Sequence, residues 1–185
     1  MRMLKNFIPA HGGYQKLLSY QKAEIIYDAT VYFTSRFYRK GDRTIDQMVQ
    51  AARSGKQNIA EASQASATSK EMEIKLTNVA RASQEELLID YRDFLRIHEL
   101  IEWPKDHVYA KRLRALNREQ NASYATFQRG IENQDQGICA NVIIGLIKVT
   151  NYLLDQQIRR LELDFLKEGG LRERMTRARL ASRNS

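Results

Sequence analysis

Proline and cysteine are both scarce in this sequence, and each scarcity excludes a class of structure. The 185 residues include two prolines, Pro9 and Pro104, and none lies between them. Because proline removes a backbone donor and clashes with the preceding helical turn, its absence favours long helices. A β-sandwich of this length would need many more turn residues. We therefore predict an all-helical protein.

The single cysteine, Cys139, excludes an internal disulfide and any metal site built from several cysteines. Residues 1–10 lack the apolar central region of a secretory signal. The most apolar stretch, 138–154, is shorter than the roughly 20 residues that span a bilayer. These features predict a cytoplasmic protein that makes no membrane contact.

Patterns that carry catalysis or bind cofactors are missing as well. Helical bundles that hold two metal ions use Glu-x-x-His pairs, and none of His11, His98 and His107 has a glutamate three residues before it. Gly55-Lys56 resembles the end of a phosphate-binding loop, but Gln50 replaces its first glycine. An enzyme would have to assemble its groups from distant residues, which leaves no sequence pattern. We predict no enzymatic activity, no cofactor and no metal.

Hydrophobic residues recur at helical spacing along most of the chain. After a leader at 1–16, the pattern predicts four long helices at 17–39, 44–66, 69–101 and 137–167. Capping boxes at Thr44–Gln47 and Thr68–Glu71 are expected to begin the second and third helices. Because the turns between the first three helices are short, we predict an antiparallel, up-down four-helix bundle in one domain, 1–185.

The second and third helices are expected to present different faces to the core. The inner face of the second helix consists of Ile45, Met48, Ala52, Gly55, Ile59, Ala62 and Ser66. Small residues alternate with large ones there, so a neighbouring helix is expected to approach closely at Gly55. The predicted apolar stripe of the third helix consists of Met72, Leu76, Val79, Ser83, Leu87, Tyr91 and Phe94. Its opposite face, which includes Glu73, is expected to be charged and solvated.

The last long helix has the clearest pattern in the chain. Its heptad positions are Ala140, Ile144, Ile147, Asn151, Leu154, Ile158, Leu161 and Phe165. This 3.5-residue period is typical of left-handed bundle packing. The first half is also apolar on other faces, so we expect it to be buried on several sides. Asn151 is polar, and a polar residue at such a position commonly specifies register or assembly state.

Two segments fall outside the predicted bundle helices. Residues 103–136 are polar, with a short basic helix expected near 108–117, and form either an insertion or a mobile connection. Gly169-Gly170 is expected to end the last long helix. These glycines belong to a basic tail, 168–185. This tail is either a frayed, solvated terminus or a tethered arm that binds phosphate.

The net charge of +8 favours a polyanionic partner, either nucleic acid or an anionic membrane surface, although such a charge can also serve solubility alone. Of the two we predict nucleic acid, RNA or DNA. The candidate nucleic-acid-binding residues are Arg36, Arg39, Lys40 and Arg43 after the first helix, and Arg172, Arg174, Arg177 and Arg179 in the tail. Tyr32 and Tyr38 lie near the first group, where tyrosines could stack on bases. The same two tyrosines could instead belong to the core or to a subunit interface.

Two segments resemble a known family. Residues 54–63, Ser-Gly-Lys-Gln-Asn-Ile-Ala-Glu-Ala-Ser, resemble the Asn-Ile-Ala-Glu-Gly motif of the four-helix-bundle proteins encoded in 23S rRNA intervening sequences. Residues 69–87, with Val-Ala-Arg-Ala-Ser at 79–83 before Glu86, resemble the second signature of that family. The family includes the accessory variability protein of diversity-generating retroelements. Ala62 departs from the motif, because glycine usually follows the motif glutamate.

The resemblance implies an antiparallel four-helix bundle that assembles into a homo-oligomer, often a pentameric ring. For the retroelement branch it also implies binding to nucleic acid and to a reverse transcriptase. The matching signature residues are Asn58, Glu61, Arg81, Ser83 and Glu86. We interpret them as structural, since polar residues on facing helices can bond to each other and set the register. A direct ligand role is the alternative.

The sequence thus predicts a non-enzymatic, homo-oligomeric helical-bundle protein that acts as a nucleic-acid-binding accessory factor. The alternative is a protein-binding scaffold oligomer with no nucleic-acid role. The two differ in whether the positive charge has a partner.

We predict a homo-oligomer in solution, because the last long helix is apolar on more faces than one partner helix can cover. The apolar side of the first helix also needs a cover, and large exposed apolar patches are unusual on monomers. Light scattering at micromolar concentration should therefore give a mass well above the 21.5 kDa of one chain. A monomeric mass would contradict this prediction.

Overall fold

Residues 13–119 and 121–183 are described by the computed structural model, and this part of the chain is all-helical, with no strand. The predicted fold class is confirmed at this level. The elements are η1 (Tyr14–Lys16), α1 (Leu18–Phe37), α2 (Arg43–Ala65), α3 (Lys70–Ile97), α4 (Val108–Leu116), α5 (Tyr124–Ile131), α6 (Gln136–Glu168) and α7 (Leu171–Arg183). Most of the expected leader, with Pro9 and His11, lies outside the described residues.

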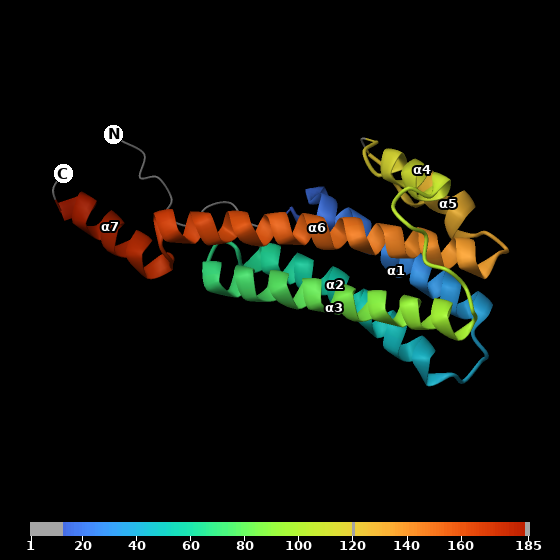
Figure 1. Cartoon of the computed structure of the whole chain (residues 1–185). Helices are drawn as coiled ribbons and strands as arrows, with labels where there is room; N and C mark the ends of the chain where they lie inside the picture. The colour runs from blue at the N-terminus through green and yellow to red at the C-terminus, as the bar shows by residue number, and fades with distance from the viewer. Residues whose placement is uncertain (1–12, 120, 184–185) are drawn as a thin grey trace.

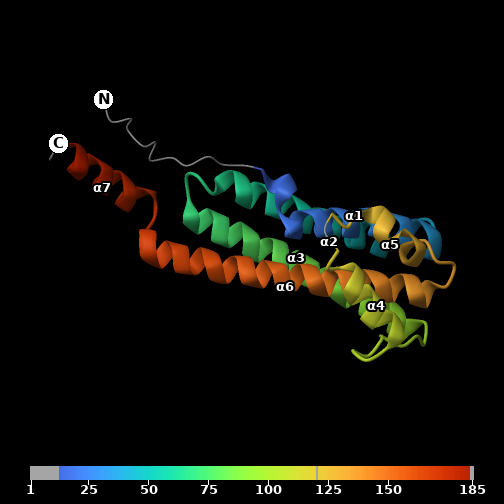
Figure 2. The ribbon, with the colours of Figure 1, turned by 90° about the horizontal axis from the view of Figure 1, so that it is seen from above.

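The four longest helices, α1, α2, α3 and α6, lie side by side and make the body of the molecule (Figure 1). α2 contacts α1 and α3, and α6 contacts the same two helices. The short helices α4 and α5 pack on α6 near its N-terminal end, whereas α7 extends beyond its C-terminal end (Figure 2). α6 therefore connects the body to additions at both of its ends.

An aromatic cluster joins α1 to α3 inside the body. Phe33 packs edge to face on Tyr91 and Phe94, with ring centroids 5.0 and 4.8 Å apart. All three side chains are buried. The Tyr91 hydroxyl donates to the Thr30 hydroxyl at 3.1 Å, so its polar atom is bonded although the ring is buried. Burial also holds the pKa of Tyr91 well above its ordinary value.

α2 and α3 approach closely at Gly55, as the pattern of small residues predicts. A Cβ atom at this position would clash with Nε2 of Gln84 on α3. Beside this contact, the hydroxyls of Ser54 and Ser83 lie 3.0 Å apart and hydrogen-bond the two helices to each other. A larger residue at position 55 would therefore have to displace the buried Gln84 side chain.

The N-termini of α2 and α3 differ from the predicted capping boxes. α2 is capped by Asp42, whose carboxylate accepts a hydrogen bond from Thr44 N at 2.9 Å. α3 is capped by Ser69, whose hydroxyl accepts from Met72 N at 3.1 Å. The predictions of Thr44 and Thr68 as caps are therefore wrong. Aspartate and serine cap at least as well as threonine, so neighbouring candidates compete at each end.

α3 ends at Ile97 and not at residue 101, because the chain forms a Schellman motif there. Glu99 takes the left-handed conformation, with a φ of 55°. Leu100 N then donates to Leu95 O at 2.8 Å, which closes the end of the helix. Glycine usually occupies the left-handed position that follows a helix. Because glutamate occupies it here, the sequence does not indicate the end of α3. Residues 100–104 continue without helix.

The first half of α3 turns a different face to the core from the predicted stripe. Met72 and Val79 are 47% and 46% exposed. The residues buried instead are Glu73, Thr77, Ala80 and Gln84. Glu73 bonds Lys70 Nζ at 2.9 Å, and the Thr77 hydroxyl donates to Glu73 O at 2.7 Å. The expectation of a solvated Glu73 is wrong, because polar groups bonded within their own helix can be buried.

The predicted heptad positions of α6 face the interior. Seven of the eight are buried, and Phe165 is half-buried. The first half is buried on other faces too, through Val142, Ile143 and Leu146. An apolar window of the helical stretch that begins at Gln136 is long enough to cross a membrane, but 67% of it is buried within the structure. That burial is typical of a core helix, so the window is weak evidence for a span.

The additional apolar faces of α6 are covered by α4 and α5. Leu113 of α4 and Phe127 and Ile131 of α5 are buried in the same core as α6. The Cys139 thiol donates to Ile131 O at 2.7 Å, and burial raises the pKa of this thiol to about 12. The described residues of 103–136 therefore include two helices packed on the core, which fits the alternative of an insertion. Helices of the same chain thus cover the apolar first half of α6, so the burial of this half gives no argument for a homo-oligomer.

Asn151 of α6 tests how a polar core residue affects stability. Its side chain is 9% exposed, Nδ2 donates to Glu85 Oε2 at 2.9 Å, and Oδ1 is buried without a hydrogen bond from any described residue. A buried, unsatisfied carbonyl costs about 1–3 kcal/mol. Asn151→Leu should therefore raise the melting temperature by roughly 2–4 °C, measured by circular dichroism.

Asn151→Asp is the matched control, because its carboxylate would face that of Glu85 and should lower the melting temperature. A lower melting temperature for Asn151→Leu than for the wild type would show that the amide stabilises the core. Since Glu85 belongs to the same chain, Asn151 sets the register of α6 against α3. We therefore expect Asn151→Leu to leave the oligomeric mass unchanged.

Candidate nucleic-acid interface

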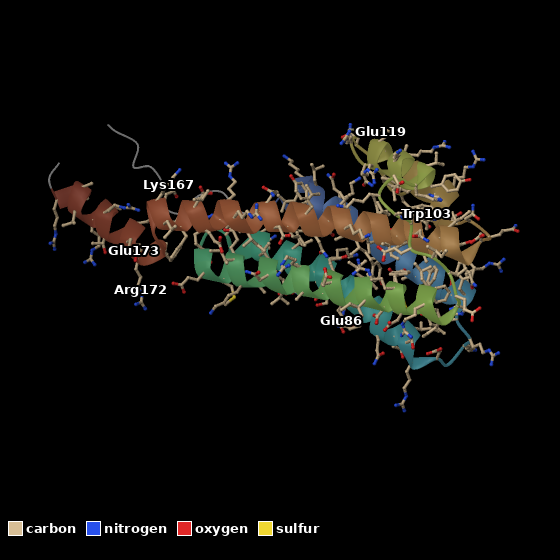
Figure 3. All side chains as sticks on the ribbon, in the orientation of Figure 1. Glu86, Trp103, Glu119, Lys167, Arg172 and Glu173 are labelled. Atoms are coloured by element: carbon tan, nitrogen blue, oxygen red, sulfur yellow. The ribbon has the colours of Figure 1, made fainter. Side chains whose placement is uncertain are left out.

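The basic tail forms a helix, α7, that projects from the body of the molecule. It follows Gly169, whose φ of 68° ends α6, and none of its residues is buried. Its thirteen residues include five arginines and one glutamate. Figure 3 shows Arg172 pointing away from the body. The described part of the tail is therefore a basic helix and not a frayed terminus, and its role as a tethered arm that binds phosphate stays a prediction.

Two of the four predicted tail arginines anchor α7 to the body. Arg174 Nη2 donates to Ala67 O, in the turn between α2 and α3, at 3.5 Å. Arg177 donates to Glu168 O at the end of α6, where a cation is also favoured by the helix dipole. The exposed arginines of α7 without such a bond are Arg172, Arg179 and Arg183. None of these three forms an ion pair within the described residues.

The second predicted basic group lies at the opposite end of the body from α7 (Figure 1). Its members are Arg36, Arg39, Lys40 and Arg43, and all four are exposed around the turn between α1 and α2. Tyr38 packs on Phe33 and Phe94, with ring centroids 6.2 and 5.5 Å away, and burial raises its pKa to about 12. Tyr32 is also partly buried against the core. Both tyrosines therefore contribute to the core, as one of the alternatives predicts.

Two of the five signature residues, Ser83 and Arg81, make contacts between helices, and a third, Asn58, bonds within α2 to the partner of Ser83. Asn58 Nδ2 donates to Ser54 Oγ at 3.1 Å, and that oxygen hydrogen-bonds the Ser83 hydroxyl on α3. Arg81 Nε lies 3.4 Å from Asp155 Oδ1 on α6. Arg81, Glu61 and Glu86 are all exposed, and the two glutamates form no ion pair within the described residues. These contacts support a structural interpretation of Asn58, Ser83 and Arg81, and they give no such support for the two glutamates.

A hollow of about 390 Å³ lies where α4, α5 and α6 meet, and the sequence patterns did not indicate it. Its lining includes Trp103, Tyr109, Arg112, Phe127, Arg129 and Asn133. The volume falls within the range of about 300–1,000 Å³ for small-molecule sites. The one available signal was the single tryptophan, which stands directly before the second proline and the basic residues of α4.

The loop that carries Trp103 is fixed against α6 by one buried amide. Asn141 Oδ1 accepts from Trp103 N at 2.7 Å, and Asn141 Nδ2 donates to Ile101 O at 3.0 Å and Gly137 O at 2.9 Å. Asn141 is itself 4% exposed, so these bonds are shielded from water. Figure 3 shows Trp103 where this loop passes α6. The position of the indole at the hollow is therefore set by the fold.

The described histidines have structural contacts, and metal-binding clusters are absent from the described residues. No group of three or more His, Cys, Asp or Glu side chains lies close enough together there to hold an ion. His98 Nδ1 hydrogen-bonds Phe94 O at 2.9 Å, and the two rings stack. His107 caps α4 by accepting from Tyr109 N at 3.3 Å. The lack of a metal and of a cofactor stays a prediction.

Comparison with known proteins identifies no relative. No family model, no curated protein and no solved structure matches this chain. The resemblance of residues 54–63 and 69–87 to the intervening-sequence family therefore stays a prediction. The same holds for what that resemblance implies, the pentameric ring and a reverse transcriptase as partner.

Glu102 makes the loop before α4 sensitive to acid. Its carboxylate accepts from Arg92 Nε on α3 at 2.9 Å and from Lys148 Nζ on α6. Burial raises the pKa of Glu102, but the hydrogen bonds and charges of Lys148 and Arg92 outweigh burial and lower it below the ordinary 4.5. A lowered carboxylate pKa stabilises the folded state above that ordinary value. This contribution is lost as the pH falls through the lowered pKa.

Glu102→Gln should therefore lower the melting temperature at about pH 7 and have a smaller effect at about pH 3. We expect a loss of roughly 1–3 °C at the higher pH, because partly exposed pairs contribute about 0–1 kcal/mol each. Thermal melts at both pH values measure the difference. Asp106→Asn, at an exposed position on the same loop, is the control. An equal effect of Glu102→Gln at both pH values would contradict the assignment.

Proposed function

We propose that this protein is a non-enzymatic, nucleic-acid-binding accessory protein whose four long helices carry α7 as a basic arm. The observation that carries the proposal is the exposure of Arg172, Arg179 and Arg183 on a helix that projects from the body. These guanidinium groups form no ion pair within the described residues. An array of unpaired arginines favours a partner that is itself a polyanion.

The composition of α7 favours phosphate over a membrane surface. A helix that lies in a membrane interface needs a continuous apolar face. The large apolar residues of α7 are Leu171, Met175 and Leu180. Met175 and Leu180 are five residues apart and so point to different sides of the helix. Five arginines with so little apolar surface suit contact with a nucleic-acid backbone.

The body is proposed to be an antiparallel, up-down four-helix bundle. In its support, the contacts α1–α2, α2–α3, α3–α6 and α6–α1 form a closed ring. The turns before α2 and α3 are short, which favours antiparallel neighbours. A homo-oligomer remains part of the proposal, supported by Tyr152, Leu163 and Leu166, which α6 exposes to solvent. Assembly would place several arms on one particle and raise avidity.

The proposal predicts that neutralising the free arginines of α7 weakens RNA binding. The variant Arg172→Ala/Arg179→Ala/Arg183→Ala keeps Arg174 and Arg177, so α7 stays anchored. If each removed arginine contacts one phosphate, the slope of log K against log salt should decrease by about 2. Fluorescence anisotropy with a labelled single-stranded RNA, titrated at salt concentrations from about 50 to 200 mM, measures both affinity and slope.

The matched control removes the same charge from the surface of the body. Arg53, Lys75 and Arg159 are exposed on α2, α3 and α6. None of the three forms an ion pair within the described residues. The control variant Arg53→Ala/Lys75→Ala/Arg159→Ala should retain more affinity than the α7 variant. Equal losses would assign binding to net charge and not to α7. No binding by the wild type at about 50 mM salt would favour the protein-binding scaffold.

A further inference from the structure

We infer that the hollow between α4, α5 and α6 binds one unpaired nucleotide of a single-stranded segment. The base would stack on Tyr109, next to Trp103, and the flanking phosphates would bind Arg112 and Arg129. This inference rests on the proposed function, because the strand that α7 attracts is the source of the nucleotide. It adds a second contact at the end of the molecule opposite to α7 (Figure 1).

The hollow has walls fixed by close contacts between helices. A Cβ atom at Gly130 on α5 would lie 2.9 Å from Val142 Cγ2 on α6. A Cβ atom at Gly145 on α6 would clash with Leu113 Cδ2 of α4. Both short helices therefore rest against α6 at glycine contacts. The space that remains between them is an open hollow of about 390 Å³, and a preformed site lowers the cost of binding.

The aromatic side of the hollow is suited to stacking. Trp103 and His107 are nearly parallel, with an interplanar angle of 11° and ring centroids 5.0 Å apart. The Tyr109 ring lies 5.4 Å from the Trp103 ring, is tilted by 46° to it, and is 48% exposed, so Tyr109 presents its own face for stacking. The indole is supported on one side by His107 and positioned by Asn141 through its backbone. An aromatic surface of this kind stacks on any base, which predicts weak sequence preference.

The positive side of the hollow has no internal counter-ion. Arg112 comes from α4 and Arg129 from α5, both are exposed, and neither forms an ion pair within the described residues. Arg114, by contrast, donates to Lys105 O at 2.5 Å. Unpaired guanidinium groups beside aromatic rings match the two parts of a nucleotide, its base and its phosphates.

The acidic residues close to Arg129 in the sequence are already bonded elsewhere. Glu132 accepts from the Tyr124 hydroxyl and from Gln128 Nε2, each at 3.1 Å. Asp135 caps α6, accepting from Gly137 N at 2.8 Å and from Ile138 N at 3.0 Å. These bonds hold both carboxylates at helix surfaces and ends, and Arg129 is left available for a phosphate.

A strand is the proposed occupant, and a free mononucleotide is not, because the hollow has two separate guanidinium groups. Arg112 comes from α4 and Arg129 from α5. The two phosphates that flank one base of a strand can use both groups.

The single tryptophan of the protein is a direct reporter of the proposed stacking. Titration with a single-stranded oligoadenylate of about ten nucleotides should quench Trp103 fluorescence in parallel with the anisotropy signal. An oligomer of the same length with abasic sites keeps the phosphates and should bind without quenching. Adenosine monophosphate should quench only at concentrations far above those at which the oligoadenylate saturates the protein.

Two variants separate the aromatic and the charged contributions. Tyr109→Ala should reduce oligoadenylate affinity by about five- to a hundredfold, the range for losing one stacked base. Arg112→Ala/Arg129→Ala should reduce it by roughly tenfold and lower the salt slope by about 1.4. Arg53→Ala/Lys75→Ala, which removes the same charge from the body, should have a smaller effect. All of these positions are exposed, so the variants should fold.

The possible failures of the two proposals are distinguishable. If the oligoadenylate binds by anisotropy but Trp103 fluorescence and the Arg112→Ala/Arg129→Ala variant are unchanged, the hollow is not the site and the proposed function stands. Quenching by adenosine monophosphate at the concentrations at which the strand binds would overturn the assignment to a strand. Absence of any strand binding at about 50 mM salt would overturn both proposals together.

Discussion

The burial of α6 is the constraint on which the rest of the structure depends. Its first half is apolar around most of its circumference, and each square ångström removed from water contributes about 25 cal/mol. Contacts with α1 and α3 cover only part of this surface. α4 and α5 cover the remainder through Leu113, Phe127 and Ile131. The hollow beside Trp103 is a consequence, because two short helices docked on one long helix leave a space between them.

Polar side chains inside the body fix how the helices pair. Ser54 and Ser83 join α2 to α3, Asn151 bonds Glu85 between α6 and α3, and Asn141 holds the loop before α4. Burying such groups is unfavourable unless they are bonded, so each pair disfavours alternative registers. Gln84 differs from the others. It is fully buried against Gly55, and neither of its amide atoms bonds to a described residue.

Positive charge has different roles at different places in this molecule. Arg174 and Arg177 bond main-chain oxygens and attach α7 to the body. Arg81 and Arg92 pair with carboxylates of neighbouring segments. Arginines without such partners lie on α7, around the hollow of α4 and α5, at the turn between α1 and α2, and at single positions on the body. The net charge of +8 therefore does not indicate how much positive charge is available for binding. Only the unpaired part of that charge is available to an anion.

The sequence by itself determined the all-helical class, the long helices, the buried heptad face of α6 and the close approach at Gly55. Each follows from local periodicity or residue size, which are legible along the chain. Tertiary structure decided the end of α3 at a left-handed Glu99, the burial of Glu73, and the docking of α4 and α5. The hollow lined by Trp103, Arg112 and Arg129 was also decided by the tertiary structure, because its residues come from separate segments. Their proximity depends on contacts with α6 that no local pattern records.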